Sequence, residues 1–571
     1  MSRKVKTGYP SIDKTHLAGI PKSKLNPKIL PLSMFGTFML INSRRLSEPA
    51  IQVGEKVYSK REVKNDVISV IRAMKDYSFA YGDTLAIATP NCYEGIVMTI
   101  AANAIGVRVA YLNPLASDDE LIADIDRCDA DHVLVYDKDD EFSKKLYNNE
   151  DMAVFLLNVI NVDTHTCAKG PYYFVSRDST FNFISYASFK TTGDYSKRAV
   201  SGPISAALFN DNVSLYLQTS GSTSGKPKIL PFTNEAIFGF MMYAKNSTGT
   251  QTNDEHVNKV MPILPFRLPY GWMGIFINFM AGHCVCLAPG ATAEDIGTYY
   301  KYKPSYIYGT PTILRAFIDN TPEDADLSWL EAFFCAGFSV SESWYQECMD
   351  FLKTHGAVRA EIRNNYGIGE GLCIGTSSDG GVPHYKNTVG RFYLGPEFYI
   401  VDENMNEVKY GEIGEAIVYS KTLCKGYLDE PELTKECFIE YKGKTFYRTG
   451  DYMSVDEDGI VTFFGRKKRF FQPLGATDKV NCETVEKAIL ECPIVKNCAV
   501  VVKRSENMAD YGKAFVVLND KDADRQEAMR AIHEFIKKTL LDYQIPEAFS
   551  ILDEIPMMKS GKIDYNYLEN I

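Results

Sequence analysis

The sequence predicts an α/β protein, with a large N-terminal domain followed by a small α+β domain. From Thr84 onward, apolar strand patterns alternate with helical patterns, which is typical of a mostly parallel sheet with helices on both faces. Between residues 390 and 464 the pattern changes to short β runs with turns, which suggests a small β-barrel or sandwich. We therefore expect an N-terminal domain at 1–464, a connection at 465–469 and a C-terminal domain at 470–571.

The first half of the chain supports this fold class element by element. Residues 1–45 are rich in Pro, Lys and Ser, and we expect them to be irregular and to wrap the first domain. Asn91 as a cap, with Glu94 three residues later, predicts a helix that ends near Gly106. The expected strands and second helix are Thr84–Thr89, Val107–Leu112, residues 118–127 (helix) and His132–Tyr136.

The second half continues the alternation and then restarts as a compact unit. The expected elements are strands Val213–Gln218 and Ile229–Phe232, a helix at Glu235–Tyr243, a strand at Ser305–Tyr308, a helix from Pro311, a strand at Leu330–Cys335, a helix near 341–354 and a strand ending at Asn364. Beyond these we expect β runs at Phe398–Val401 and Glu415–Tyr419, and two helices striped by Val485, Ala488 and Ile489 and by Met529, Ile532, Phe535 and Ile536.

One segment could be mistaken for a membrane span. Trp272 to Pro289 contains no Asp, Glu, Lys or Arg, and its length fits a bilayer. However, Asn278, Gly282 and His283 divide it into a short helix pattern and a strand at Cys284–Ala288. We therefore expect a buried helix, a turn and a strand, with no membrane span.

The composition indicates a soluble cytoplasmic protein. The net charge of −11 argues against general binding to nucleic acids or anionic membranes. The thirteen cysteines show no CxxC pair and no zinc-ligand spacing, so we expect buried free thiols in a reducing compartment. No apolar stretch follows the charged N-terminus, so we expect no signal peptide.

The central motif is the stretch between the strands at Val213 and Ile229. It reads Thr219-Ser220-Gly221-Ser222-Thr223-Ser224-Gly225-Lys226-Pro227-Lys228. Glycines let backbone N–H groups approach phosphate oxygens, hydroxyls donate hydrogen bonds and lysine supplies positive charge. The stretch differs from the P-loop of NTPases, because its glycines are one residue too close and Pro227 stands in place of Ser or Thr. A polyphosphate site is the functional interpretation, and a Gly/Ser surface hairpin is the structural one.

Several further motifs follow in a fixed order. They are Asn113-Pro114, Tyr308-Gly309-Thr310-Pro311-Thr312, Asn364 to Glu370, Val389-Gly390, Gly411-Glu412-Ile413-Gly414-Glu415, Gly426-Tyr427 with Pro431 and Thr434, Tyr447 to Asp451, Gly465-Arg466 and Lys559-Ser560-Gly561-Lys562. Together with the 219–228 loop, the chain from about residue 50 to the C-terminus resembles the adenylate-forming superfamily. This family includes acyl- and aryl-CoA ligases, adenylation domains of nonribosomal peptide synthetases and luciferases.

The resemblance implies a role for each matched residue. The loop from Thr219 to Gly225, including Thr223, would wrap the ATP phosphates with Lys228, while Gly337, Asn364, Tyr366 and Gly367 would hold adenine. Asp451 would accept both ribose hydroxyls, Arg466 would help hold ribose and phosphate, and Glu370 would bind Mg²⁺. Lys562 would bridge the α-phosphate and the substrate carboxylate. The acid would lie among Phe266, Leu268, Tyr270, Trp272, Gly337 and Phe338.

The resemblance also implies a mobile C-terminal domain. Lys468 would be the hinge residue, and the loop around Gly475 would face the active site during the thiol step. The basic run at 467–469, flanked by phenylalanines, could also be a nucleic-acid patch, but it is short and the chain is acidic. Three positions depart from the family pattern: Gly369 where Thr is usual, Leu268 where many CoA ligases have His, and Lys468-Arg469 where acids are usual.

These observations predict an ATP-dependent acid–thiol ligase that uses ATP, Mg²⁺ and coenzyme A. A stand-alone adenylation enzyme that loads the phosphopantetheine arm of a carrier protein is an alternative. A nucleotide-binding member that has lost catalysis is another, because Gly369 removes one hydroxyl near the α-phosphate. From Met261 to Met280 there is no Asp or Glu, so we expect an apolar or aromatic acid without an α-amine. Arg267 could receive a second carboxylate or could lie at the surface.

Overall fold

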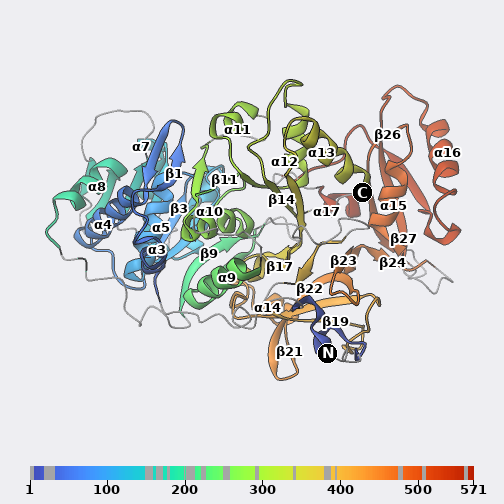
Figure 1. Cartoon of the computed structure of the whole chain (residues 1–571), viewed down its shortest axis with the longest axis horizontal. Helices are drawn as coiled ribbons and strands as arrows, with labels where there is room; N and C mark the ends of the chain where they lie inside the picture. The colour runs from blue at the N-terminus through green and yellow to red at the C-terminus, as the bar shows by residue number, and fades with distance from the viewer. Residues whose placement is uncertain are drawn as a thin grey trace.

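The computed structural model describes most of the chain (Figure 1). The described residues are 6–17, 32–147, 158–162, 172–175, 180–198, 200, 212–219, 227–247, 257–289, 295–337, 342–377, 388–392, 395–473, 480–504, 510–558 and 563–571. They form a mixed α/β protein, with a large N-terminal domain and a small C-terminal domain at the opposite end of the molecule (Figure 1). The predicted fold class is confirmed at this level.

The first sheet has eight strands. In spatial order they are β10 (Ile229–Thr233), β9 (Val213–Gln218), β4 (Arg108–Tyr111), β3 (Thr84–Ala88), β5 (His132–Tyr136), β6 (Asn158–Val162), β8 (Thr180–Ser185) and β7 (Tyr172–Val175). The six central strands are parallel, and the two edge strands are antiparallel to their neighbours. The predicted strands around the glycine-rich loop are therefore confirmed as the hairpin β9–β10.

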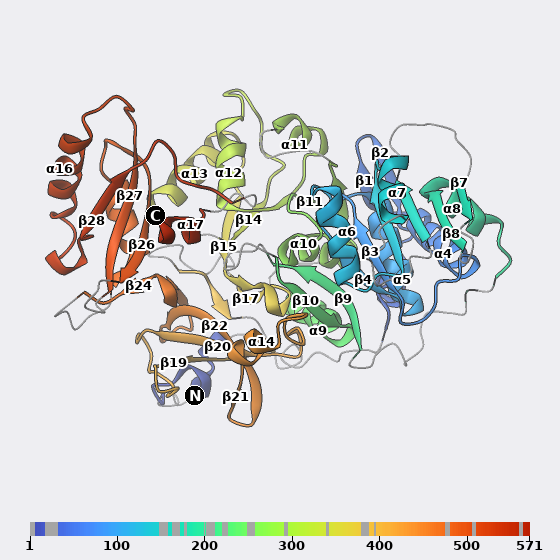
Figure 2. The same cartoon turned by 180° about the vertical axis from the view of Figure 1, so that it is seen from behind.

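Helices cover both faces of this sheet (Figure 2). They are α3 (Met34–Asn42), α4 (Lys60–Asp76), α5 (Tyr93–Ile105), α6 (Asp118–Arg127), α7 (Asp140–Tyr147) and α8 (Tyr186–Tyr195). Alternate residues of β3 pack on opposite sides, since Leu85 and Ile87 join the core with α5 whereas Ala86 and Ala88 join the core with α6. Burial on both faces explains why such strands read as continuous apolar runs.

The second sheet has seven strands. Their order is β15 (Glu361–Asn365), β14 (Ala332–Ala336), β13 (Tyr306–Gly309), β11 (Lys259–Pro262), β12 (Cys284–Leu287), β1 (Pro49–Val53) and β2 (Lys56–Ser59). All are parallel except β2, which is antiparallel to β1. The accompanying helices are α9 (Asn234–Ser247), α10 (Pro269–Ala281), α11 (Ile296–Tyr302), α12 (Pro311–Asp319) and α13 (Glu342–Thr354).

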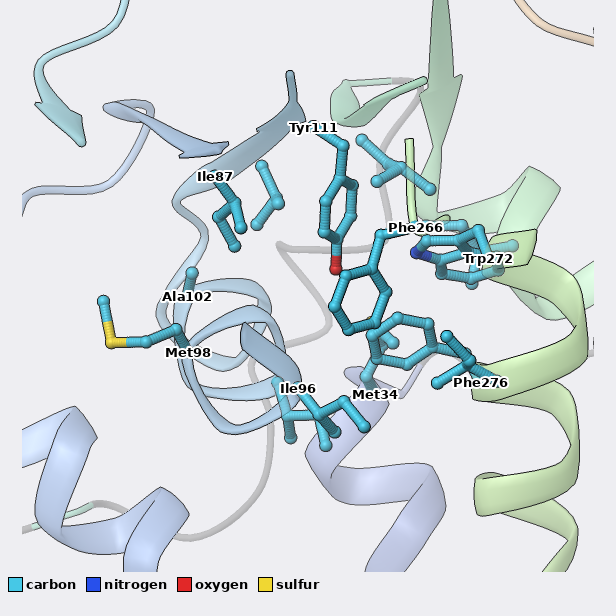
Figure 3. Packing of buried hydrophobic residues seen from close by; sticks show 14 of the residues in the cluster. Met34, Ile87, Ile96, Met98, Ala102, Tyr111, Phe266, Trp272 and Phe276 are labelled. Atoms are coloured by element: carbon cyan, nitrogen blue, oxygen red, sulfur yellow. The ribbon is translucent and has the colours of Figure 1, made fainter. Parts of the chain in front are cut away.

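Helix α10 and strand β12 confirm the predicted helix, turn and strand. Gly282 ends the helix with φ of 94°, a conformation that glycine adopts without strain. Buried aromatic residues of α10 and the preceding loop pack against β4 and α5 (Figure 3). Among the described residues, no helix is long and apolar enough to cross a lipid bilayer.

Two predictions near the N-terminus are wrong in detail. Residues Met34–Asn42 form helix α3, which is nearly all apolar and so gave no amphipathic signal within the supposedly irregular 1–45. The cap of α5 is Cys92, whose sulfur accepts from Gly95 N–H, and not Asn91. The Asn91 side chain instead donates to Leu264 O and accepts from Phe266 N–H, at 2.9 Å each.

The β-rich part contains two antiparallel units. The smaller has β16 (Gly367–Ile368), β17 (Ile374–Ser377) and β18 (Arg391–Phe392), with the turn η3 (Gly369–Gly371). The larger has β19 (Glu397–Val401), β20 (Gly414–Tyr419), β22 (Lys444–Val455), β21 (Phe438–Tyr441) and β23 (Val461–Arg466), with α14 (Pro431–Cys437). Strand β22 pairs with three neighbours, and the ladder among described strands is open where a small barrel or sandwich was expected.

The N-terminal residues lie against this β-rich part. Helix α1 (Pro10–Asp13) and the turn η1 (Thr15–Leu17) follow Gly8, whose carbonyl accepts from Tyr410 N–H at 3.0 Å. Lys6 pairs with Glu457 at 3.0 Å. Residues 6–17 therefore contact the β-rich part, which follows the two large sheets in the sequence.

The C-terminal part of the chain follows the turn η4 (Lys467–Arg469). Its elements are β24 (Phe470–Phe471), β25 (Val480–Asn481), α15 (Cys482–Leu490), β26 (Val495–Arg504), β27 (Asp510–Leu518), α16 (Arg525–Ile536), η5 (Asp542–Gln544), β28 (Ala548–Ile551) and α17 (Tyr565–Asn570). Strands β26, β27 and β28 form one sheet, and the buried faces of α15 and α16 include the predicted Val485, Ala488, Ile489, Ile532 and Ile536.

The cysteines of the described residues form no disulfide, and all but Cys373 and Cys437 are buried. This agrees with the expectation of buried free thiols.

Candidate active site

A cavity of about 1870 Å³ lies where the second sheet, the β-rich part and the C-terminal domain meet. Residues at the carboxyl ends of β13, β14 and β15 line it, including Thr310, Gly337 and Asn365. In open α/β sheets, ligands bind outside the carboxyl ends of the strands. The cavity is therefore in the place where this architecture holds substrates.

Most of the predicted site residues in the described part line this cavity. They are Thr219, Lys228, Leu268, Tyr270, Gly337, Asn364, Tyr366, Gly367, Glu370, Asp451, Arg466 and Lys468. Nine other predicted residues lie outside the described residues: Ser220, Gly221, Ser222, Thr223, Ser224, Gly225, Phe338, Gly475 and Lys562. The fold thus gathers side chains from positions as far apart as β9 and η4.

Phe266 and Trp272 do not line the cavity. Both are buried in the core, where Phe266 stacks on Tyr111 and Trp272 stacks on Phe276 (Figure 3). Met273, on a neighbouring face of α10, lines the cavity in their place. Arg267 is also absent from the cavity lining, and it lies near the carboxylate of Asp124.

The ends of the glycine-rich stretch are held together. Thr219 N–H donates to Lys228 O at 2.9 Å, and Lys228 N–H donates to Thr219 Oγ1 at 3.0 Å. The Lys228 ammonium lies 4.9 Å from the centre of the Tyr427 ring, and no described carboxylate forms an ion pair with it. A charged group that is fixed at its backbone and unpaired at its tip suits an anionic ligand.

Glu370 lies on η3, and its carboxylate has one hydrogen-bonding partner among the described residues. The Tyr427 hydroxyl donates to its Oε1 at 2.7 Å, and the Tyr447 hydroxyl lies 3.3 Å from that of Tyr427. Burial and the nearby Glu370 charge raise the pKa of Tyr427, so its hydroxyl stays protonated as a donor. The other carboxylate oxygen, Oε2, makes no hydrogen bond with a described residue.

Asp451 lies on β22 and is almost fully buried, with 1% of its surface exposed. Tyr366 donates its hydroxyl to Oδ2, and Arg466 Nε lies 3.0 Å from Oδ1. No donor in the described part is aligned for a hydrogen bond to Oδ1. Burial raises the pKa of Asp451, although Arg466 opposes the shift.

The glycines at this site leave room beside the backbone. Gly337 has φ of 93° and a Cβ there would meet nothing within 4 Å, which leaves space for a flat ligand against the backbone. A Cβ on Gly369 would lie 3.4 Å from Pro269 Cγ, an ordinary contact. The departure at Gly369 is therefore not required by packing.

The connection at η4 is anchored on both sides of Lys468. Lys467 lies 3.2 Å from Glu415, which also accepts from Arg448 at 3.0 and 2.6 Å. Burial works against ionisation, but these two cations hold the pKa of Glu415 below its usual value.

On the C-terminal side, Arg469 lies 2.5 Å from Glu486 and its guanidinium covers the Tyr565 ring at 4.0 Å. Glu486 also accepts from Val500 N–H at 2.7 Å. Lys467 thus pairs with a residue of the N-terminal domain and Arg469 with one of the C-terminal domain. The side chain of Lys468, between them, is exposed.

The sequence analysis missed Tyr427, Tyr447 and Glu486 as site residues. Tyr427 belongs to the motif Gly426-Tyr427, and Tyr447 begins the motif that ends at Asp451. These motifs were the sequence signal that could have identified the two residues. Glu486 reaches Arg469 across seventeen positions, and no local pattern reveals that pairing.

Comparison with known proteins identifies the family. The family model of the AMP-binding enzyme matches residues 42–428, and that of the AMP-binding enzyme C-terminal domain matches residues 484–562. The chain is 27% identical over 371 residues to bacitracin synthase 1 of Bacillus licheniformis, covering 62% of this chain and 7% of the relative. It is 34% identical over 177 residues to a D-alanine--D-alanyl carrier protein ligase of Streptococcus pyogenes, covering 30% of this chain and 34% of the relative. The chain thus spans only part of the length of these relatives.

Solved structures share the fold. The anthranilate CoA ligase AuaEII with anthranoyl-AMP superposes with a TM-score of 0.76 at 20% identity, covering 96% of this chain and 98% of the other. The amide bond synthetase McbA from Marinactinospora thermotolerans superposes with a TM-score of 0.74 at 20% identity, covering 94% and 99%. Because the family model spans more than half of the chain, this protein belongs to the adenylate-forming AMP-binding enzymes, as its sequence motifs predicted.

Proposed function

We propose that this protein is an ATP-dependent acid–thiol ligase. A carboxylic acid attacks the α-phosphate of ATP to give acyl-AMP and pyrophosphate, and a thiol then displaces AMP to give a thioester. Coenzyme A is the proposed thiol. Activation is needed because a carboxylate has no adequate leaving group, whereas AMP in an acyl-adenylate leaves readily. Family membership supports adenylate formation, and the acid and thiol are the proposed refinements.

One observation carries this proposal. Lys228, Glu370 and Asp451 come from three separate elements and line one cavity with space beside Gly337. They supply an ammonium without an ion pair among the described residues, a carboxylate with one oxygen that bonds to no described residue, and a buried carboxylate beside Arg466. These groups suit a triphosphate, a metal ion and a ribose respectively.

In the first half-reaction, the side chains hold the substrate carboxylate close to the ATP triphosphate, although both groups are negatively charged. We assign Thr219 and Lys228 to the phosphates, Asn364 and the Tyr366 ring to adenine, and Asp451 with Arg466 to the ribose. Lys562 belongs to the segment 559–562, which lies between Met558 and Ile563 in the chain. Both of these flanking residues line the cavity. This supports the assignment of Lys562 to the transferring phosphate, where positive charge stabilises the transition state.

Glu370 fits a magnesium ion. Its Oε1 is held by Tyr427 while Oε2 has no hydrogen bond within the described part. No cluster of three or more potential metal ligands occurs among described residues, and Mg²⁺ is commonly held by one or two carboxylates together with substrate phosphates. When bound, Mg²⁺ would neutralise phosphate charge, and Tyr427 would keep the Glu370 carboxylate oriented toward it.

For the second half-reaction we propose rotation of the C-terminal domain about Lys468. Lys467 is held to the N-terminal domain and Arg469 to the C-terminal domain. The exposed residue between them is the position at which a backbone change moves one domain without breaking either ion pair. We also propose the boundaries 465–469 for this connection and a role for the Gly475 loop in the thiol step.

We propose an acid without an α-amine. The segment from Met261 to Met280 has no Asp or Glu, and its cavity-lining members include Leu268, Tyr270 and Met273. A buried ammonium without a carboxylate partner would cost several kcal/mol. Arg267 lies outside the cavity lining, which removes the earlier reason to expect a second substrate carboxylate.

Loading of a carrier protein is the second proposal, and the similarity to a carrier protein ligase favours it. Acid-dependent pyrophosphate release, followed by thioester assays with coenzyme A and with a holo carrier protein, separates the two. Thioester on the carrier alone would support the second proposal. ATP binding without pyrophosphate release with any acid of a broad panel would identify a non-catalytic member and contradict both.

A further inference from the structure

The inner part of the cavity follows one face of α10. Tyr270, Met273, Ile277 and Ala281 recur every three or four residues and all line the cavity. Met273 and Ala281 are eight residues apart, or about 12 Å along the helix axis. The cavity is also lined by Thr37 and Ile41 of α3 and by Phe238 and Met241 of α9.

The part of the cavity along α10 leads away from the proposed catalytic groups. The first turn of α10 lies beside η3, because a Cβ on Gly369 would touch Pro269. The last turn lies beside α3, where Asn42 Nδ2 donates to Met280 O at 3.3 Å. A ligand with its carboxylate near Glu370 would therefore extend its other end toward the end of α10.

His283 follows α10 directly after Gly282 and borders this end of the cavity. Only 3% of its surface is exposed, and neither Nδ1 nor Nε2 has a hydrogen-bonding partner in the described residues. The buried His132 differs, since its ring nitrogens lie 3.0 Å from Asp83 and from Asn158. Buried polar side chains without partners are rare and costly, and each calls for an explanation.

His283 is neutral near pH 7. Burial and, to a smaller extent, the nearby cations Arg45 and Lys60 together lower the pKa of its imidazole to about 4. A neutral imidazole offers one donor and one acceptor. Thr37 adds a second polar group, because its Oγ1 is buried and also has no partner among the residues described.

We propose that His283 and Thr37 form a polar subsite that recognises a hydroxyl at the far end of an elongated apolar acid. The apolar body would lie along Met273, Ile277 and Ala281, and the hydroxyl would donate to and accept from the two side chains. This inference rests on the proposed function for the direction in which the acid enters. It narrows the substrate class from apolar acids to apolar acids with a distal hydroxyl.

The test compares dodecanoic acid with ω-hydroxydodecanoic acid, by calorimetric titration and by pyrophosphate release. We expect the full-length protein to bind the hydroxy acid about tenfold more tightly, the value of one or two new hydrogen bonds. His283→Leu should abolish this preference and leave ATP affinity unchanged. His355→Leu is the matched control, because His355 is not among the residues that line the cavity.

Stability provides an independent readout. Since the His283 nitrogens have no partner in the described part of the chain, His283→Leu should keep or raise the unfolding temperature, whereas replacing a histidine with a structural role would lower it. Thr37→Val is the second variant, and this single change should reduce the preference for the hydroxy acid. Equal binding of the two acids by the wild type, no binding of either, or a preference retained in His283→Leu would overturn the inference. A preference in binding without pyrophosphate release would support the subsite and contradict the proposed function.

Discussion

The hydroxyl of Tyr427 donates a 2.7 Å hydrogen bond to Oε1 of Glu370. This contact joins the loop before α14 to the turn η3, fifty-seven positions apart in the chain. It holds one carboxylate oxygen, while the other makes no hydrogen bond with a residue that the structure describes. Groups that orient a metal ligand tune the affinity for the metal even though they never touch it.

Tyr427→Phe should therefore weaken magnesium binding. The change removes the hydroxyl and keeps the ring beneath Lys228, so Glu370 loses its orientation while packing is retained. We expect the Mg²⁺ concentration for half-maximal ATP binding to rise roughly tenfold or more, as measured by calorimetry. Tyr447→Phe is the control with a smaller effect, because among the described residues the Tyr447 hydroxyl lies beside that of Tyr427 and makes no hydrogen bond with Glu370. An unchanged Mg²⁺ dependence in Tyr427→Phe would remove Tyr427 from this role.

Asp451→Ala should weaken ATP binding by about 1.5–3 kcal/mol, because two ribose hydroxyls would lose a charged acceptor. Calorimetric titration of the folded variant measures this. Normal ATP affinity together with lost thermal stability would instead assign Asp451 to the turn alone.

Asp451→Asn separates charge from shape. Because burial raises the pKa of Asp451 in the folded state, its protonated form contributes stability that is fully present below the unfolded pKa and is lost as pH rises through the folded value. At pH 7 the buried charge therefore costs stability, and Asp451→Asn should unfold at the same or a higher temperature while binding ATP more weakly. A large loss of stability at pH 7 would contradict this sign.

Glu415→Gln should destabilise the protein in a pH-dependent manner. Arg448 and Lys467 keep the pKa of Glu415 below its usual value, so its contribution is full above the unfolded pKa, about 4.3, and is lost as pH falls through the folded value. Because both cations are about one-third exposed, we expect a loss of about 1–3 kcal/mol at pH 7. Chemical unfolding at pH 7 and pH 4 measures it, and a loss that is larger at pH 4 would be inconsistent.

The two half-reactions should separate by mutation. Lys562→Ala removes a charge aimed at the transferring group, so adenylation should fall roughly 10²-fold or more, while thioester formation from supplied acyl-AMP should survive. Lys468→Pro fixes φ at the connection and restricts Lys467 before it, so adenylation should be kept and thioester formation impaired. Lys468→Ala is the control and should retain both steps. Normal adenylation by Lys562→Ala, or equal damage to both steps by Lys468→Pro, would contradict the proposal that the C-terminal domain serves the two half-reactions in two orientations.

The sequence predicted the large elements well because their signals are local. Helix α6 (Asp118–Arg127) matches the expected bounds, since an amphipathic stripe and a Ser117 cap mark its ends. Helix α3 was missed because it is apolar on all sides and carries no stripe. Cys92 is the cap because the Asn91 side chain is hydrogen-bonded to the backbone of Leu264 and Phe266. Leu264 is 173 positions away in the chain, so no local pattern predicts this contact.

The site was predictable as a set of motifs, but not in its lining. Helix α10 is apolar throughout, so its sequence could not tell whether Trp272 or Met273 faces the cavity. The structure buries Trp272 completely and leaves Met273 on the cavity wall. Tertiary partners such as Glu486 for Arg469 and Tyr427 for Glu370 depend on how separate elements pack, which no spacing in one chain encodes.

The most direct test of adenylate formation follows the carboxylate oxygen. An acid that supports pyrophosphate release is labelled with heavy oxygen in its carboxylate, and the products with ATP and coenzyme A are examined by mass spectrometry. Attack on the α-phosphate forms a bond from a carboxylate oxygen to phosphorus, and the thiol then breaks the acyl carbon–oxygen bond. One labelled oxygen should therefore appear in AMP and none in pyrophosphate. Unlabelled AMP, or ADP with labelled inorganic phosphate, would contradict the mechanism.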